Sequence, residues 1–87
     1  MTTPTFSLDA YRLRLALADA LTGWTGTTYG DYRTWTRKGP NGVVRVVLEH
    51  ATGRVRINAP GVADRYRRWT TRYYASVADA LRTAGVL

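Results

Sequence analysis

Two short turns between three strand-like segments most constrain what this chain can fold into. Residues 31–37, 43–49 and 54–58 are rich in β-branched and aromatic residues, and each segment predicts a β-strand. The segments are joined by residues 39–42 and 51–53, which have typical turn sequences. Because connections this short join antiparallel neighbours, the sequence predicts a three-stranded antiparallel meander.

A helix is predicted on each side of this meander. Apolar residues recur at helical spacing between Ser7, a good helix cap, and Gly23, a good helix stop. The expected buried face of this first helix contains Leu8, Tyr11, Leu15 and Ala18, widened by Leu13, Leu17 and Leu21. Residues 24–30, a run rich in threonine and glycine, are interpreted as a loop that leads into the first strand.

The second helix is predicted over residues 62–84, and Gly85 closes it. Its apolar stripe has alternating steps of four and three residues and consists of Val62, Tyr66, Trp69, Tyr73, Val77, Ala80 and Ala84. A helix of roughly 23 residues would be about 34 Å long, which exceeds the length of the strands. We therefore expect it to overhang the sheet or to bend near Thr70 and Thr71.

Together these elements predict a single α+β domain over residues 1–87. The expected fold has two layers, in which a three-stranded meander is covered on one face by an N-terminal and a long C-terminal helix, in the order αβββα. A chain of 87 residues is long enough for one hydrophobic core, and its 45% hydrophobic residues are an ordinary globular value. Strand alternation predicts that the buried side of the sheet carries Val44, Val46, Leu48, Val55 and Ile57.

The first predicted strand, residues 31–37, can pair with residues 43–49 in either of two registers. If Arg37 pairs with Val43, then Tyr32, Thr34 and Thr36 point inward and Trp35 points outward. A slip of one residue would place Trp35 in the core instead. The first register is preferred, and it predicts an aromatic platform within a basic outer face that carries Arg33, Trp35, Arg37, Arg45, Arg54 and Arg56.

The net charge of +7 on 87 residues predicts a negatively charged partner, either nucleic acid or an acidic protein surface. A second basic surface is expected on the C-terminal helix, in the row Arg65, Arg68 and Arg72, extended by Arg67. The chain has no cysteine, which excludes disulfides and thiolate zinc sites and fits a reducing cytoplasm. Neither a signal peptide nor a membrane-spanning segment is expected.

The sequence offers no arrangement of residues typical of an enzyme. His50 is the only histidine, and the six acidic residues are scattered over different predicted elements. The glycines of residues 39–42 precede a strand, whereas a nucleotide-binding loop precedes a helix. We therefore expect no catalytic residue, no metal site and no cofactor.

The predicted order of helix, three antiparallel strands and helix resembles the double-stranded-RNA-binding domain. The segment Lys38-Gly39-Pro40-Asn41 is similar to that family's Gly-Pro loop, and Arg65, Arg67 and Arg68 sit where the family has lysines that open its last helix. The family's histidine after Gly-Pro is absent here, and the final helix is aromatic instead of alanine-rich, so the chain is not assigned to the family. The outline is also similar to domains that lay a sheet in the DNA major groove.

Two functions remain open. The preferred hypothesis is a small basic nucleic-acid-binding protein without enzymatic activity, which contacts phosphates through Arg33, Arg45, Arg54 and Arg56, with Arg65, Arg68 and Arg72 as a secondary patch. The alternative is a protein-interaction module, such as a phage or mobile-element inhibitor or adaptor that occupies an acidic or nucleic-acid-binding site on a host protein. The uncovered sheet face or the overhanging helix would also allow a homodimer.

Overall fold

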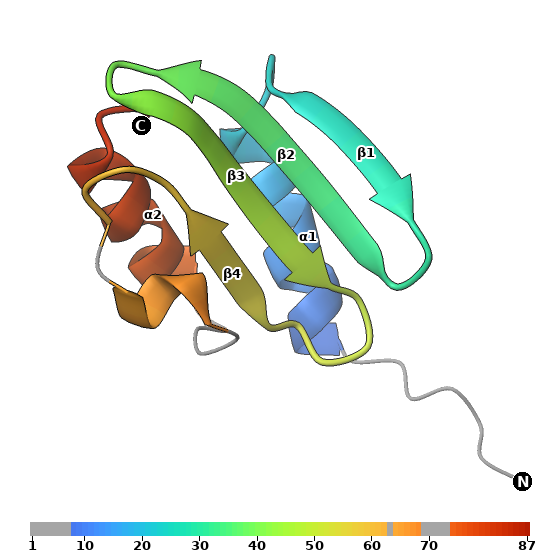
Figure 1. Cartoon of the computed structure of the whole chain (residues 1–87). Helices are drawn as coiled ribbons and strands as arrows, with labels where there is room; N and C mark the ends of the chain where they lie inside the picture. The colour runs from blue at the N-terminus through green and yellow to red at the C-terminus, as the bar shows by residue number, and fades with distance from the viewer. Residues whose placement is uncertain (1–7, 63, 69–73) are drawn as a thin grey trace, which may run out of the picture.

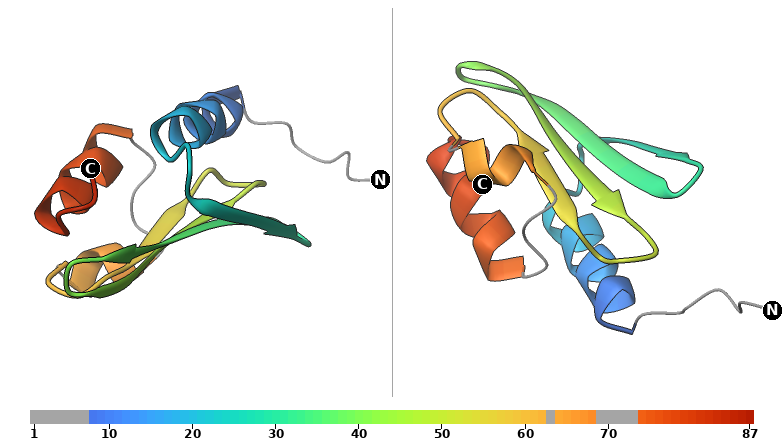
Figure 2. Two further views of the ribbon diagram at one scale, coloured as in Figure 1. Left: turned by 90° about the horizontal axis from the view of Figure 1, so that it is seen from above. Right: turned by 60° about the horizontal axis from the view of Figure 1, so that its bottom comes forward.

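The computed structural model describes residues 8–62, 64–68 and 74–87, which form an α+β architecture (Figure 1). In chain order the elements are α1 (Leu8–Ala20), β1 (Thr25–Tyr29), β2 (Tyr32–Gly39), β3 (Gly42–Glu49), β4 (Val55–Asn58), the 3-10 helix η1 (Asp64–Arg67) and α2 (Tyr74–Thr83). The four strands form one antiparallel sheet in the order β1-β2-β3-β4. Figure 2 shows α1 and α2 on the same side of this sheet, so the elements form two layers.

The sheet has one strand more than the sequence predicts, and the predicted three-stranded meander is wrong in this respect. The additional strand is β1, which lies in the threonine-rich segment interpreted as a loop. Threonine is β-branched and favours extended backbone, and Gly30, with a φ of 53°, allows the tight turn into β2. β1 pairs with β2 along its whole length, from Thr25 opposite Thr36 to Tyr29 opposite Tyr32.

The register of the β2–β3 hairpin differs by one residue from the preferred prediction. Gly39 pairs with Gly42, so the turn between the strands contains only two residues. Arg37 consequently lies opposite Val44, whereas the sequence predicts it opposite Val43. A slip of one residue exchanges the two faces of a strand, and Trp35 therefore lies opposite Val46 on the side of the helices.

The prediction that Trp35 stands on an exposed aromatic platform is thus wrong. Its indole is only 3% exposed and belongs to the hydrophobic core. Burying a tryptophan removes a large apolar area from water, which favours the observed register over the one expected from the sequence. Tyr32, Thr34 and Thr36, which were expected to point inward, lie on the opposite face.

The core between the sheet and the helices follows the predicted alternation in β3 and β4. The five residues predicted to be buried are confirmed, namely Val44, Val46, Leu48, Val55 and Ile57. Leu13 and Leu17 of α1, and Leu21 directly after it, pack into the core. Tyr11, Leu15 and Ala18, which were also expected to be buried, are exposed because the sheet covers only one side of the helix.

A close contact between α1 and the β3–β4 turn holds the helix against this end of the sheet. Gly53 has a φ of 71°, and a Cβ atom added there would lie 2.9 Å from the Cβ atom of Ala10. Only glycine accommodates both the backbone conformation and the approach of the helix. The turn therefore fixes where α1 begins to pack on the sheet.

The long C-terminal helix predicted over residues 62–84 is not continuous. Asp64–Arg67 forms the short helix η1, which packs against β4, and α2 begins only at Tyr74. A straight helix of the predicted length would overhang the sheet, whereas the divided segment allows both Tyr66 and Val77 to pack on the core. The bend expected near residues 70–71 lies outside the described residues. None of the described helices is long and apolar enough to cross a membrane.

Replacing Trp35 by alanine tests the observed register. We expect Trp35→Ala to lower the free energy of unfolding by about 3–5 kcal/mol, because it removes a buried aromatic side chain. The matched control is Tyr29→Ala, which removes an exposed aromatic ring and should cost less than about 1 kcal/mol. Urea denaturation of both variants measures the difference, and equally small losses would contradict the buried position of Trp35.

Candidate functional site

The face of the sheet turned away from α1 and α2 is open, and we call it the outer face (Figure 1). Strand pairing and alternation determine which side chains it carries. They are Thr25, Thr27 and Tyr29 on β1, Tyr32, Thr34, Thr36 and Lys38 on β2, Val43, Arg45, Val47 and Glu49 on β3, and Arg56 and Asn58 on β4. This mixed polar and aromatic face contrasts with the apolar side that packs on the helices.

A hollow of about 280 Å³ lies on the outer face, and we call it the arginine hollow. It is lined by Arg45, Val47, Arg56, Asn58 and Arg67. The lining residues of β3 and β4 face each other in pairs across the two strands. The fifth residue comes from η1, which packs beside β4 and so brings a third guanidinium group to the hollow.

The chemistry of the arginine hollow favours an anion. Guanidinium groups remain charged at neutral pH and donate several hydrogen bonds in a planar arrangement that matches carboxylate and phosphate groups. Among the side chains that the structure describes, the lining includes three arginines and the Asn58 amide and no acidic residue. Its volume lies just below the range of about 300–1,000 Å³ that is typical of pockets for whole small molecules. The hollow is therefore suited to a single charged group that projects from a larger ligand.

The structure divides the arginines predicted for the sheet face between the two sides of the sheet. Arg45 and Arg56 lie on the outer face, and both line the hollow. Arg54 is exposed just before β4, where its carbonyl accepts a hydrogen bond of 2.9 Å from the backbone N–H of Glu49. Arg33 and Arg37 lie on the side of the helices, because the register of β2 is shifted.

Arg33 was predicted to bind a ligand, but its side chain instead contacts other residues of the sheet. Its Nη1 atom donates a hydrogen bond of 2.9 Å to the Thr28 hydroxyl, and its guanidinium carbon lies 5.4 Å from the centre of a Trp35 ring. The side chain passes so close to Gly26 that an added Cβ atom there would collide with it. Arg33 thus joins β2 to β1 through the hydrogen bond to Thr28, and its cation–π contact with Trp35 lies within β2.

The arginines predicted to form a row on the C-terminal helix do not lie on one continuous helix. Arg67 belongs to η1 and faces the hollow, although the sequence assigned it to the row on the C-terminal helix. Arg68 follows η1 and is exposed. The side chain of Arg65 and the whole of Arg72 lie outside the described residues. The sequence missed the position of Arg67 because a continuous helix would have directed it away from the sheet.

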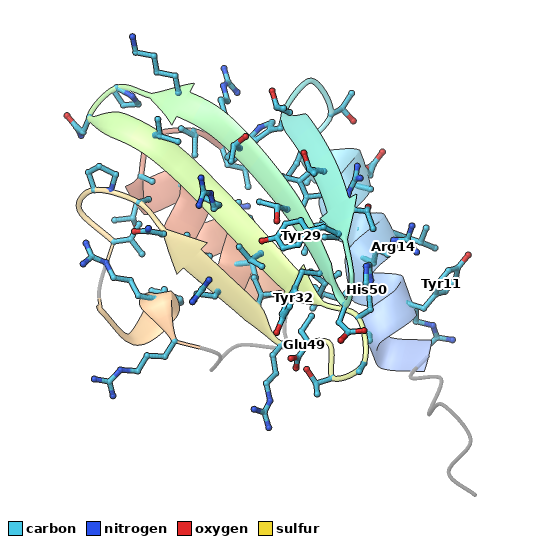
Figure 3. All side chains as sticks on the ribbon, turned by 45° about the vertical axis from the view of Figure 1, so that its right-hand side comes forward. Tyr11, Arg14, Tyr29, Tyr32, Glu49 and His50 are labelled. Carbon is cyan, nitrogen blue, oxygen red and sulfur yellow. The ribbon has the colours of Figure 1, made fainter. Side chains whose placement is uncertain are left out.

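A pair of tyrosines, Tyr29 and Tyr32, lies on the outer face (Figure 3). Tyr29 of β1 is 57% exposed and lies opposite Tyr32 of β2. The centres of their rings are 6.0 Å apart, and the ring planes are inclined at 44°. The two-residue turn at residues 40–41 was the sequence signal that could have placed Tyr32 on this face, because it determines the register of β2.

Comparison with protein-family models, with curated proteins and with solved structures finds no match. Among the residues that the structure describes, no three histidine, aspartate or glutamate side chains gather as a possible metal site. His50 directly follows β3, and its backbone N–H donates a hydrogen bond of 2.9 Å to the carbonyl of Asp31. A functional interpretation therefore rests on the geometry of the outer face.

Thr34 provides a test of how the outer face is packed. It is 7% exposed, and its hydroxyl has no hydrogen-bond partner among the described residues. A buried unpaired hydroxyl costs about 1–3 kcal/mol, so Thr34→Val should raise the free energy of unfolding by about 1 kcal/mol. The control is Thr36→Val, since the Thr36 hydroxyl has a partner in the Thr25 carbonyl at 3.4 Å. Urea denaturation measures both, and a loss of stability in Thr34→Val would contradict this interpretation.

Proposed function

We propose that this protein binds nucleic acid without enzymatic activity and contacts the phosphates through the arginine hollow. The supporting observation is that three guanidinium groups from three elements surround one hollow on an uncovered sheet face. Phosphate groups carry the negative charge that such a site requires, and they accept paired hydrogen bonds from arginine. A repeating phosphate backbone would bring one such group into the hollow and others to the surface around it.

Charge outside the hollow supports the same proposal. The net charge of +7 gives the protein a positive field, which raises the association rate with a polyanion. Arg54 and Arg68 are exposed, one beside β4 and the other directly after η1. We assign them peripheral phosphate contacts, because neither lines the hollow. The chain has no cysteine and so needs no oxidising compartment, which favours action in the cytoplasm.

A second candidate function is a protein-interaction module, and the edge of β1 favours it, because no other described strand pairs with that edge. All five residues of β1 are exposed, and the segment contains neither proline nor a charged residue. Such residues commonly protect sheet edges, so an unprotected edge can pair with a strand from a second copy or from another protein. Binding of this kind would not depend on Arg45 and Arg56, which lie two and three strands away from β1.

Salt-dependent binding of random DNA and RNA oligonucleotides distinguishes the two functions. We expect Arg45→Ala and Arg56→Ala each to raise the dissociation constant about tenfold, since each removes a charged hydrogen-bonding group. The slope of log affinity against log salt should fall by about 0.7–0.9 for each phosphate that the variant no longer neutralises.

The matched control for this experiment is Arg37→Ala, which removes the same charge from the other side of the sheet. It should change the affinity far less than the two variants in the hollow. Equal losses in all three variants would show that binding depends on net charge alone. No binding at low salt would exclude the nucleic-acid function and leave the protein-interaction module.

A further inference from the structure

We infer that the outer face binds single-stranded nucleic acid, with a phosphate in the arginine hollow and bases stacked on Tyr29 and Tyr32. This inference rests on the proposed nucleic-acid function and specifies its ligand. The tyrosine pair and the hollow are separate features of the structure, and neither implies the other. Their position on one open face is the observation that connects them.

The tyrosine pair adjoins the hollow across the β2–β3 pairing. Val47, which lines the hollow, lies opposite Thr34, and Tyr32 is two residues before Thr34 on the same strand. Diagonal neighbours of this kind in an antiparallel sheet are about 7–8 Å apart. Tyr29 lies opposite Tyr32 and extends the aromatic surface toward the edge strand.

Thr34 and Val47 lie between the tyrosine pair and the three arginines on the outer face. They are only 7% and 4% exposed, although neither α1 nor α2 covers this face. Neither side chain therefore projects far enough into solvent to separate a ligand on the tyrosines from one in the arginine hollow.

The tyrosine pair favours unpaired bases. Exposed aromatic rings on a sheet bind single strands because every base has a flat face that can stack on a ring. In a duplex those faces are already stacked on neighbouring bases, and only the base edges are accessible in the grooves. Because Tyr29 is 57% exposed, its ring is available to a base from solvent.

The acidic residue on this face gives the bound strand an orientation. Glu49 lies opposite Tyr32, at the end of the tyrosine pair away from Arg45. Its carboxylate accepts a hydrogen bond from the Thr52 hydroxyl. Phosphates are repelled from Glu49 and attracted to the hollow, so the sugar-phosphate backbone lies on the side of the arginines.

Fluorescence anisotropy with labelled oligonucleotides tests this inference. The probes are a single strand of about 12 nucleotides, a length within the usual site size for such proteins, and a duplex of the same length. We expect Tyr29→Ala to weaken binding of the single strand about tenfold and to leave duplex binding unchanged. Tyr29→Phe keeps the ring and should bind the single strand as the original protein does.

An abasic strand of equal length provides a second control, because it keeps the phosphates and lacks the bases. The original protein should bind it about as weakly as Tyr29→Ala binds the normal strand. If Tyr29→Ala binds the single strand normally while Arg45→Ala does not, the stacking inference is wrong and the proposed function stands. Equal weakening for single strand and duplex would also overturn the inference. If the original protein binds neither probe, both the inference and the proposed function are wrong.

Discussion

The register of the β2–β3 hairpin is the constraint on which the rest of the structure depends. A two-residue turn pairs Gly39 with Gly42, and every later pair along the hairpin follows from it. This register directs Trp35 into the core and Tyr32 to the outer face. Had the strands paired one residue earlier, the core would lose its only sheet tryptophan, and the outer face would lose half of its tyrosine pair.

The two faces of the sheet have separate roles because both helices pack on the same one. The helices cover the main apolar side of β3 and β4, and the opposite side of these strands is mixed, with Val43 and Val47 among charged and polar residues. The outer face can then carry charged and aromatic side chains at little cost in stability. Arg33, by contrast, contributes to the sheet itself, where it contacts Thr28 and Trp35.

The candidate site is assembled from segments that are distant in the sequence. Tyr29 and Tyr32 flank one turn, Arg45 and Arg56 come from the two later strands, and Arg67 comes from η1. The sequence predicted Arg45 and Arg56 correctly as residues of the outer face, because each stands between two buried apolar residues of its strand and successive side chains of a strand point to opposite faces. It could not predict Arg67, since only the division of the C-terminal segment brings η1 beside β4.

The sequence by itself determined the α+β class, the succession of the strands β2, β3 and β4 joined by short turns, and the buried side of β3 and β4. It did so because a period of two residues identifies a strand's apolar face without reference to its neighbours. In β2, both faces carry polar and aromatic residues, so the pattern alone does not specify which face is buried. β1 has no apolar face at all, and it is joined to β2 by strand pairing, by the hydrogen bond from Arg33 to Thr28 and by the contact between Tyr29 and Tyr32. Only the tertiary structure decided these positions, because they depend on turn geometry and on which face the helices cover.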